Sequence, residues 1–538
     1  MSRALLFLTS ASAVFPPHGW SSGRGFLWAD WSPNPDSLDW PLSPEALADL
    51  ATRYRVHSLE QCFGCSWSAG PCNASEAHVI AAARGLKAAA VAAGSQPPVV
   101  LMYVQGQTPR SCFAADKEYM AHPEWFLRFD SNAWAGQPVL NNPRTHSLDD
   151  NTFLNYNNAS ARAWWGAQAW AQPGARGIID GIYADGVGWQ NWHNRFAGNI
   201  SWGLTYALNN ASVLMMAEAK ALGYTAIMYN GFEVSNRYAP DWNEGMLAVT
   251  DGADIEHWGA FECILPNGSM NVSMFSAVIL QAFARGNDGS GKGIFIKGWP
   301  GPVVAPVFFL PQDAWGPHRM TPSWPMNSTP LTVPARSQAL LDFFPFFYAT
   351  FLMAAGPTTY FHYSWWYDLC DGTSPVCKQG SAWADLGQLL DKRTGAPLGA
   401  PTIAGTVFSR SFECVSVSVD LGEWTSAVFA WVPEAAIEVH AVVLGVPTVV
   451  FNVSVPVDPR APTTAYAVMQ RAAEDPQALV FEQRAIGGHP FIISFGPLPC
   501  TRERCWYYTI NGRSGALAVD EAPLSAGDVL RWDYLALA

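Results

Sequence analysis

The feature that most constrains the fold of this chain is a repeated alternation of short apolar runs with helix-like stretches, between residues 24 and 363. Eight runs have the length and β-branched content of buried strands: 25–31, 55–61, 98–105, the first part of 177–192, 224–232, 252–261, 293–298 and 358–363. Helix-like stretches separate most of them: 75–93, 159–172, 211–223, 274–285 and 337–355. Strands that alternate with helices pair in parallel, and eight such units predict an α/β fold, a (β/α)8 barrel of the TIM type. A doubly wound sheet is the alternative, although no glycine-rich phosphate-binding loop follows any run.

The stretch 177–192, GIIDGIYADGVGWQNW, is the most informative of the eight. Its apolar run ends at Asp185, and two glycines and Trp189 follow closely. A buried carboxylate is costly unless it is paired or used, and ligands of parallel sheets bind at the carboxyl ends of the strands. A carboxylate beside an indole also suits a sugar, which needs an acid for its chemistry and a flat apolar surface for its C–H face. The stretch therefore predicts Asp185 as a catalytic residue and Trp189 as a substrate contact.

A second acid should lie near the first one. Glu256, in the run 252–261, is the predicted proton donor, because the neighbouring His257 and Trp258 could supply the partly apolar setting that raises the pKa of a carboxyl group. Glu233 is the alternative candidate for the proton donor, and a solvated charge in a loop is an equally good interpretation of it. If Asp185 and Glu256 act together, their oxygens should lie within about 5–9.5 Å, the span of both glycosidase mechanisms.

Other polar and aromatic residues also collect where the strand-like runs end, which is where barrel active sites lie. The candidate substrate contacts are Asp30, Tyr103, Trp189, Asn230, Trp258, Lys297, Trp299, His362, Tyr363 and Trp366. Asp180 lies near the start of its strand and is predicted to be structural. The histidines show no HxH or HExxH spacing, so we expect no catalytic metal and no other cofactor.

Residues 22–435 carry several segments of recognisable sequence: DGIYADG at 180–186, HPEWFLRFDS at 122–131, FLMAAGPTTYFHY at 351–363 and SRSFECVSVSVDL at 409–421. Together they resemble the glycoside-hydrolase-like barrel families related to endo-galactosaminidases and clan D α-galactosidases. The resemblance implies a glycosidase in which the aspartate that ends the fourth strand, here Asp185, is the nucleophile or general base. It implies little about the substrate.

The sequence changes character after the barrel, and short alternating strands at 406–412, 414–419 and 427–431 predict a small β element packed on it. The predicted domains are a barrel over 22–398, this β extension over 399–435 and a separate unit over 440–538. Residues 506–534, WYYTINGRSGALAVDEAPLSAGDVLRWDY, resemble the C-terminal domain of transcobalamin and intrinsic-factor proteins, a small β-grasp-like α+β unit that binds a ligand. The helical barrel that accompanies it in cobalamin carriers is absent, so cobalamin is not implied and the ligand stays open.

Several features predict secretion. Arg3 and the apolar run 4–14 fit a signal peptide cut after residue 13, with a buried first strand as the alternative. Eight N-x-S/T sequons suggest a glycosylated surface: Asn73, Asn158, Asn199, Asn210, Asn267, Asn271, Asn327 and Asn452. The ten cysteines favour disulfides. The expected bonds are Cys370–Cys377, Cys500–Cys505 and pairs among Cys62, Cys65, Cys72 and Cys112. A zinc site at Cys62-x-x-Cys65 is the alternative.

Composition excludes other classes of function. The net charge is −13 with only 31 Lys and Arg, which argues against a nucleic-acid partner. No uninterrupted apolar run after the N-terminus reaches the ~18 residues of a membrane span. The sequence therefore predicts a secreted, extracellular or cell-wall glycoside hydrolase that cleaves a polysaccharide or a glycoprotein glycan. The alternative is a non-catalytic glycan-binding or cell-wall protein on the same scaffold, in which a key carboxylate would be paired with arginine.

Overall fold

A computed structural model describes most of the barrel and parts of the C-terminal region. The described residues are 14–20, 23–31, 42–60, 63–64, 75–108, 112–140, 152–187, 193, 196, 198–232, 242–259, 263–265, 269–299, 333–364, 389–423, 426–432, 434–443, 446–456, 463–473, 481–486, 489–495, 498–499, 504–511, 513–514, 522–524 and 528–536.

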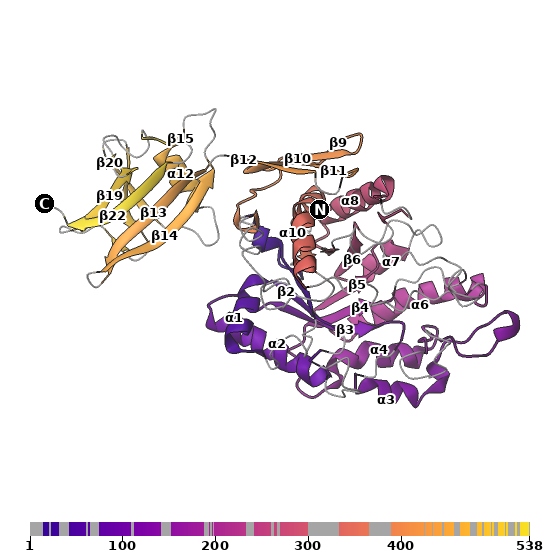
Figure 1. The fold of residues 1–538 in the computed structure, drawn as a ribbon. Coiled ribbons are helices and arrows are strands. Elements are labelled where there is room, and N and C mark those ends of the chain that lie inside the picture. The colour runs from indigo at the N-terminus through magenta and orange to yellow at the C-terminus, as the bar shows by residue number, and fades with distance from the viewer. Residues whose placement is uncertain are drawn as a thin grey trace, which may run out of the picture.

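Eight parallel strands form one sheet, and each strand pairs with its neighbour in the chain (Figure 1). They are β1 (Ala29–Trp31), β2 (Val56–Leu59), β3 (Val99–Gln105), β4 (Gly181–Asp185), β5 (Ala226–Asn230), β6 (Gly252–Trp258), β7 (Gly293–Gly298) and β8 (Thr359–Tyr363). A parallel bridge between Leu27 and Phe361 brings the first strand back beside the last. The predicted (β/α)8 barrel is therefore confirmed.

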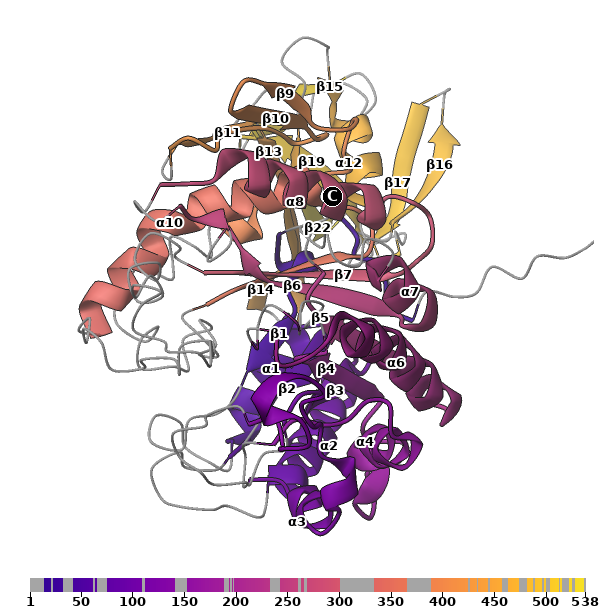
Figure 2. The ribbon, with the colours of Figure 1, turned by 90° about the vertical axis from the view of Figure 1, so that its right-hand side faces the viewer.

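Helices surround the sheet (Figure 2). They are α1 (Pro44–Arg53), α2 (Ser75–Ala92), α3 (Ala115–Met120), α4 (Ala159–Ala171), α6 (Trp202–Ala221), α7 (Trp242–Val249), α8 (Val272–Gly286) and α10 (Val333–Ala354), with short 3-10 turns η1 (Gly23–Phe26), η2 (Pro123–Trp125) and η3 (Asn132–Trp134). Side-chain oxygens of Ser43, Asn158, Ser201 and Asn271 accept backbone N–H groups at the starts of α1, α4, α6 and α8. The Ser201 cap explains why α6 begins earlier than the predicted residue 211.

The interior of the barrel is filled by side chains. The ring centroid of Trp28 lies 5.0 Å from that of Phe295 and 6.4 Å from that of Tyr183, and all three rings are buried. Since successive side chains of a strand point to opposite faces, the residues two positions later, Lys297 and Asp185, also point into the barrel, closer to its carboxyl end. The aromatic layer is thus a dry floor beneath the polar groups.

A four-stranded antiparallel sheet follows the barrel, in the order β12-β11-β10-β9. Its strands are β9 (Thr402–Ala404), β10 (Val407–Ser411), β11 (Val415–Asp420) and β12 (Ala427–Trp431). Arg410 of β10 is buried, and its Nη1 donates to the carbonyl oxygens of Leu352 and Ala355 at 2.8 and 2.7 Å. Leu352 lies in the last turn of α10 and Ala355 directly follows the helix, so Arg410 joins the β extension to the barrel at this helix end.

The C-terminal region holds further sheets, which stand apart from the barrel in Figure 1. The largest has the order β14-β13-β22-β19-β20: β13 (Glu434–Val443), β14 (Val446–Pro456), β19 (Arg504–Ile510), β20 (Arg513–Ser514) and β22 (Val529–Ala536). The others comprise β15 (Thr463–Thr464), β16 (Phe481–Ile486), β17 (His489–Phe495), β18 (Leu498–Pro499) and β21 (Pro523–Leu524), beside α12 (Ala465–Ala473). Because β13 starts at Glu434, this unit begins before the predicted residue 440.

Part of the evidence for secretion lies outside the described residues: the segment 1–13, Cys62, Cys65, Cys72, both cysteines of 370–377, Cys500, and the sequons at Asn73, Asn267 and Asn327. Cys112 is disulfide-bonded. Asn199 is buried, and its Oδ1 accepts a hydrogen bond from Asn132 Nδ2 at 3.3 Å. Asn210, by contrast, is exposed on α6. No helix in the described part of the chain is long and apolar enough to span a membrane.

Candidate active site

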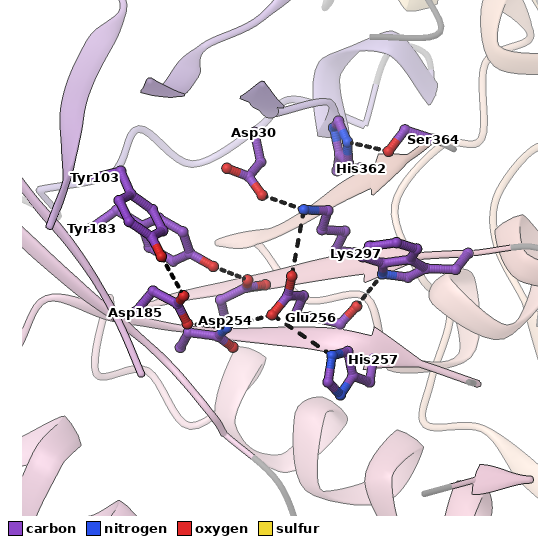
Figure 3. Close-up of polar contacts among 12 residues, drawn as sticks. Asp30, Tyr103, Tyr183, Asp185, Asp254, Glu256, His257, Lys297, His362 and Ser364 are labelled. Carbon is purple, nitrogen blue, oxygen red and sulfur yellow. Dashed lines mark hydrogen bonds and ion pairs between the residues drawn. The ribbon is translucent and has the colours of Figure 1, made fainter. Parts of the chain in front are cut away.

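Four partly exposed polar side chains lie at the carboxyl ends of four consecutive strands (Figure 3 shows two of them, Asp185 and Glu256). Gln105, Asp185 and Asn230 are the last residues of β3, β4 and β5, and Glu256 lies near the end of β6. Gln105 is in register with Asp185, and Asn230 with Asp254, two positions before Glu256. Parallel pairing therefore brings the four side chains to one rim of the barrel, as predicted for three of them.

Asp185 is held by hydrogen-bond donors alone. Its Oδ2 accepts from Tyr103 Oη at 2.6 Å and from Gln105 Nε2 at 3.2 Å. Its Oδ1 accepts from the Gly186 backbone nitrogen at 2.6 Å and from Asn230 Nδ2 at 2.8 Å. Gly186 adopts a φ of 67°, which favours glycine. Asp185 thus acts only as an acceptor, as an ionised carboxylate does, and its orientation is fixed.

Glu256 lies beside Asp185 and shares a partner with it. Asn230 Nδ2 donates to Glu256 Oε2 at 2.6 Å as well as to Asp185 Oδ1 at 2.8 Å. These two oxygens therefore lie no farther apart than the sum of the two distances, about 5.4 Å. Retaining glycosidases hold their two carboxyl groups about 5–5.5 Å apart, and inverting ones about 6.5–9.5 Å. The side chain of Glu256 is 12% exposed, with His257 Nε2 and Lys297 Nζ each 3.7 Å from one of its oxygens.

A fully buried ion pair links β7, the neighbour of β6, to β1. Lys297 Nζ of β7 donates to Asp30 Oδ2 of β1 at 2.5 Å (Figure 3). Burial lowers the pKa of Lys297, but the charges of Asp30 and Glu256 outweigh it and hold that pKa above its ordinary value. Burial likewise raises the pKa of Asp30, and the Lys297 charge outweighs it and lowers that pKa. Both groups therefore stay charged.

Two further buried carboxyl groups are uncharged. Burial, together with the negative charge of Asp30, raises the pKa of Glu60 well above its usual range, and the two carboxyl groups share a hydrogen bond. Burial, followed by the charges of Asp30 and Glu256, does the same to the pKa of Asp254, which accepts from Tyr183 Oη at 2.7 Å. Asp30 is paired with Lys297, so Asp185 and Glu256 are the partly exposed carboxyl groups of this cluster.

His362 belongs to the buried side and is neutral. Burial, and then the nearby Lys297 charge, lowers its pKa to about 4. Its Nδ1 lies 3.2 Å from the Trp28 carbonyl oxygen, which can only accept, and its Nε2 lies 2.8 Å from Ser364 Oγ. The imidazole is thus fixed with its proton on Nδ1.

The predicted substrate contacts fall into different places. Tyr103 and Asn230 contact Asp185, whereas Asp30, Lys297 and His362 join the cluster but are almost fully buried. Trp299 is also buried, with its indole nitrogen donating to the Glu256 carbonyl at 2.5 Å. Glu233, Trp189 and Trp366 lie outside the described residues.

Trp258 and Tyr363 face the helices instead of the barrel interior. Trp258 Nε1 donates to Thr350 Oγ1 at 3.0 Å, and Tyr363 Oη donates to the Leu340 carbonyl at 3.0 Å, both on α10. Strict alternation would place Trp258 on the side of Glu256, but the pairing of β6 with β7 shifts register before Trp258. Tyr363 directly follows the inward His362, so alternation turns it outward. Neither residue is brought to Asp185 and Glu256.

Sequence reasoning gave no role to Gln105, Glu60, Asp254 and Tyr183. The sequence could have indicated two of them. Tyr183 and Asp254 lie two positions before Asp185 and Glu256, so their side chains point to the same face of the sheet as those two acids. The signal for Glu60 was weaker, since an acid just after a strand is also a common surface residue.

No known protein family and no curated protein matches this chain. Among solved structures, it is similar to the glycoside hydrolase domain of PelA from Pseudomonas aeruginosa (11% identity, 51% of this chain and 83% of that chain, TM-score 0.30). It is also similar to the GH36 α-galactosidase AgaB from Geobacillus stearothermophilus (10% identity, 95% and 55%, TM-score 0.34). A shorter part is similar to haptocorrin in complex with Cbi (13% identity, 22% and 29%, TM-score 0.17). The similar structures thus include glycoside hydrolases, and at these TM-scores none of the likenesses bears on the chemistry.

Proposed function

We propose that this protein is a retaining glycoside hydrolase that uses Asp185 and Glu256. The observation that carries the proposal is the Asn230 amide, which lies within hydrogen-bond distance of both carboxylates and limits their nearest oxygens to a separation of about 5.4 Å. This upper limit lies below the about 6.5–9.5 Å of inverting glycosidases, so it favours attack by one carboxylate on the sugar over a mechanism that needs a water molecule between the two groups.

In the proposed reaction, Asp185 Oδ attacks the anomeric carbon while Glu256 donates its proton to the glycosidic oxygen. The bond from that carbon to the oxygen breaks, the leaving sugar departs as an alcohol, and an ester joins the remaining sugar to Asp185. Glu256, now ionised, takes a proton from water as the water attacks the anomeric carbon and frees Asp185. Each of the two attacks inverts the configuration at the anomeric carbon, so the product has the same anomeric configuration as the substrate.

The surrounding groups support these roles. Asp185 is oriented by Tyr103, Gln105 and Asn230, which all donate to it. Lys297 Nζ lies 2.5 Å from Asp30 Oδ2 and 3.7 Å from Glu256 Oε1, so its ion pair with Asp30 is the closer of the two.

The test uses the purified full chain, a panel of soluble polysaccharides and aryl glycosides, and NMR of the first anomer released. We expect net retention for the wild type. Asp185→Asn should lose at least about 10³-fold in kcat, since it removes the nucleophile. Glu256→Gln should impair substrates with poor leaving groups more than activated aryl glycosides, which need little protonation.

The matched control is Glu423→Gln in an exposed turn of the β extension, which should keep full activity. Net inversion would remove the nucleophile role from Asp185, and full activity of Asp185→Asn would overturn the proposal. Binding of glycans by the wild type without any hydrolysis would favour the alternative, a non-catalytic glycan-binding protein.

We also propose that the protein acts outside the cell or in the cell wall. The sequons, including the exposed Asn210, and the cysteine content support this. Removal of N-linked glycans from the protein purified from its native source should shift its mass. An unmodified protein with free thiols at 370, 377, 500 and 505 would contradict it.

A further inference from the structure

The exposed aromatic rings of the described residues are concentrated in one part of the barrel. Among the described residues, the large aromatic side chains that are exposed are Trp134 (38%), Trp202 (36%) and Tyr206 (53%). All three lie in the segments that connect β3 to α4 and β4 to α6, or at the start of α6. The exposed aliphatic side chains, by contrast, are scattered from Val91 to Val428, as single exposed apolar residues usually are.

The topology places these rings on the face of the barrel that holds the carboxylates. A helix that follows a parallel strand begins beyond the carboxyl end of that strand. Trp202 is the first residue of α6, the helix that follows β4 and Asp185, and Tyr206 lies one turn further on. Trp134 ends η3, between β3 and α4, and α4 lies beside α6 (Figure 1).

The two segments are fastened to each other. Ser131 Oγ and Asn132 Nδ2 both donate to the Gly198 carbonyl, at 2.6 and 2.9 Å, and the Ser201 backbone nitrogen donates to Asp130 Oδ1 at 2.7 Å. Asn132 adopts a φ of 60°, a strained backbone conformation that these contacts hold in place. The aromatic residues therefore project from a connected, preorganised surface.

The rings are also held individually. His193 stacks on Trp202 with their centroids 4.4 Å apart and their planes 21° apart, and His193 Nδ1 lies 2.8 Å from the Ile200 carbonyl oxygen. The rings of Trp202 and Tyr206 lie 6.2 Å apart at 32°. A flat ring supported on one face and exposed to water is suited to stacking against the C–H face of a sugar.

We infer that Trp202 and Tyr206, together with Trp134, form an aromatic platform that binds a polysaccharide chain at the carboxyl end of the barrel, the end that also carries Asp185 and Glu256. The inference rests on the proposed function and deepens it, because a separate binding surface is useful only for a polymer. With a net charge of −13, the protein should favour uncharged or cationic polysaccharides over anionic ones.

The binding test uses the full chain carrying Asp185→Asn, so that the polymer is not degraded, in native gels that contain guar galactomannan, dextran, glycol chitosan or alginate. At least one uncharged or cationic polymer should retard the protein, and alginate should not. Trp202→Ala and Tyr206→Ala should each weaken the retardation about five- to tenfold, and Trp202→Phe less. Leu214→Ala, an equally exposed position on the same helix, is the matched control and should bind normally. Thermal melting checks that every variant is folded.

A second measurement separates this inference from the proposed function. In the otherwise wild-type chain, Trp202→Ala and Tyr206→Ala should raise KM for the polymer by a larger factor than KM for an aryl glycoside. If the variants bound the polymer more weakly than the wild type but the wild type hydrolysed nothing, the platform would be supported and the proposed glycosidase activity would be wrong. Three outcomes would contradict the platform. In the first, the variants hydrolyse and bind the polymer as the wild type does; in the second, they lose equal activity on the polymer and the aryl glycoside; in the third, no polymer retards the protein.

Discussion

The two sides of the barrel's carboxyl end carry the same kinds of residue in different settings. On the side of β3 to β6, Asp185, Asn230 and Glu256 are partly exposed. On the side of β7, β8, β1 and β2, Lys297 and Asp30 are completely buried. Solvent access divides the carboxyl groups into those that can meet a substrate and those that support the site.

The buried side fixes charge at a cost. Removing a lysine and an aspartate from water costs several kcal/mol each, and their attraction balances this only when their geometry is good. Glu60 avoids the cost by keeping its proton, since burial and the charge of Asp30 raise its pKa. Asp185 needs no such compensation, because it is partly exposed and accepts hydrogen bonds from four donors. The predictions below test this division, from the largest expected effect to the smallest.

Lys297→Met should destabilise the fold by about 3–5 kcal/mol, because it leaves Asp30 buried without a counter-ion. Urea unfolding of the full chain measures this. The control is Lys87→Met, which breaks the partly exposed Lys87–Asp180 pair at the other end of the barrel and should cost less than about 1 kcal/mol. Equal losses in the two variants would remove the distinction between a supporting and an open side.

His362→Gln should change how stability depends on pH. The folded protein binds a proton on His362 only near pH 4, whereas the unfolded chain does so near 6.5. Protonation therefore favours the unfolded state, and this residue lowers the free energy of unfolding as the pH falls from 6.5 to 4. The wild type should lose about 3 kcal/mol relative to His362→Gln across that window. Parallel stability curves would show that water reaches His362.

Asn230→Ala should act on the open side and affect activity more than stability. It removes the amide that holds both carboxylates, so kcat/KM for an aryl glycoside should fall about 10- to 100-fold through misplacement of the reacting groups. Asn210→Ala, exposed on α6, is the control and should keep full activity. A change in melting temperature as large as that of Lys297→Met would mean that Asn230 is structural.

Truncation after Val432, before β13, should have the smallest effect. The C-terminal sheets pair among themselves and not with the barrel strands. The barrel and its β extension should stay folded and keep kcat/KM for an aryl glycoside within about twofold. The loss of soluble protein would show that the barrel needs the C-terminal unit, and that the predicted division into domains is wrong.

The sequence by itself determined the order of the strands and the acids that end them. Apolar runs separated by helices specify a parallel barrel, because this pattern reflects which faces each element must bury. Runs that end in Asp185, Asn230 and close to Glu256 then put these residues at one rim, since parallel strands share an edge. The start of α6 was misplaced because a single cap, Ser201, outweighed the weak helical pattern before residue 211.

Only the tertiary structure decided which side chains a substrate can reach. Asp30 and Lys297 lie 267 positions apart in the chain, and their burial depends on every strand between them. The register shift after Ile255 turns Trp258 towards α10. The pairing of β4, β5 and β6 places the Asn230 amide between the carboxylates of Asp185 and Glu256. Solvent exclusion and charge balance arise from contacts between residues distant in sequence, and a local pattern carries no record of them.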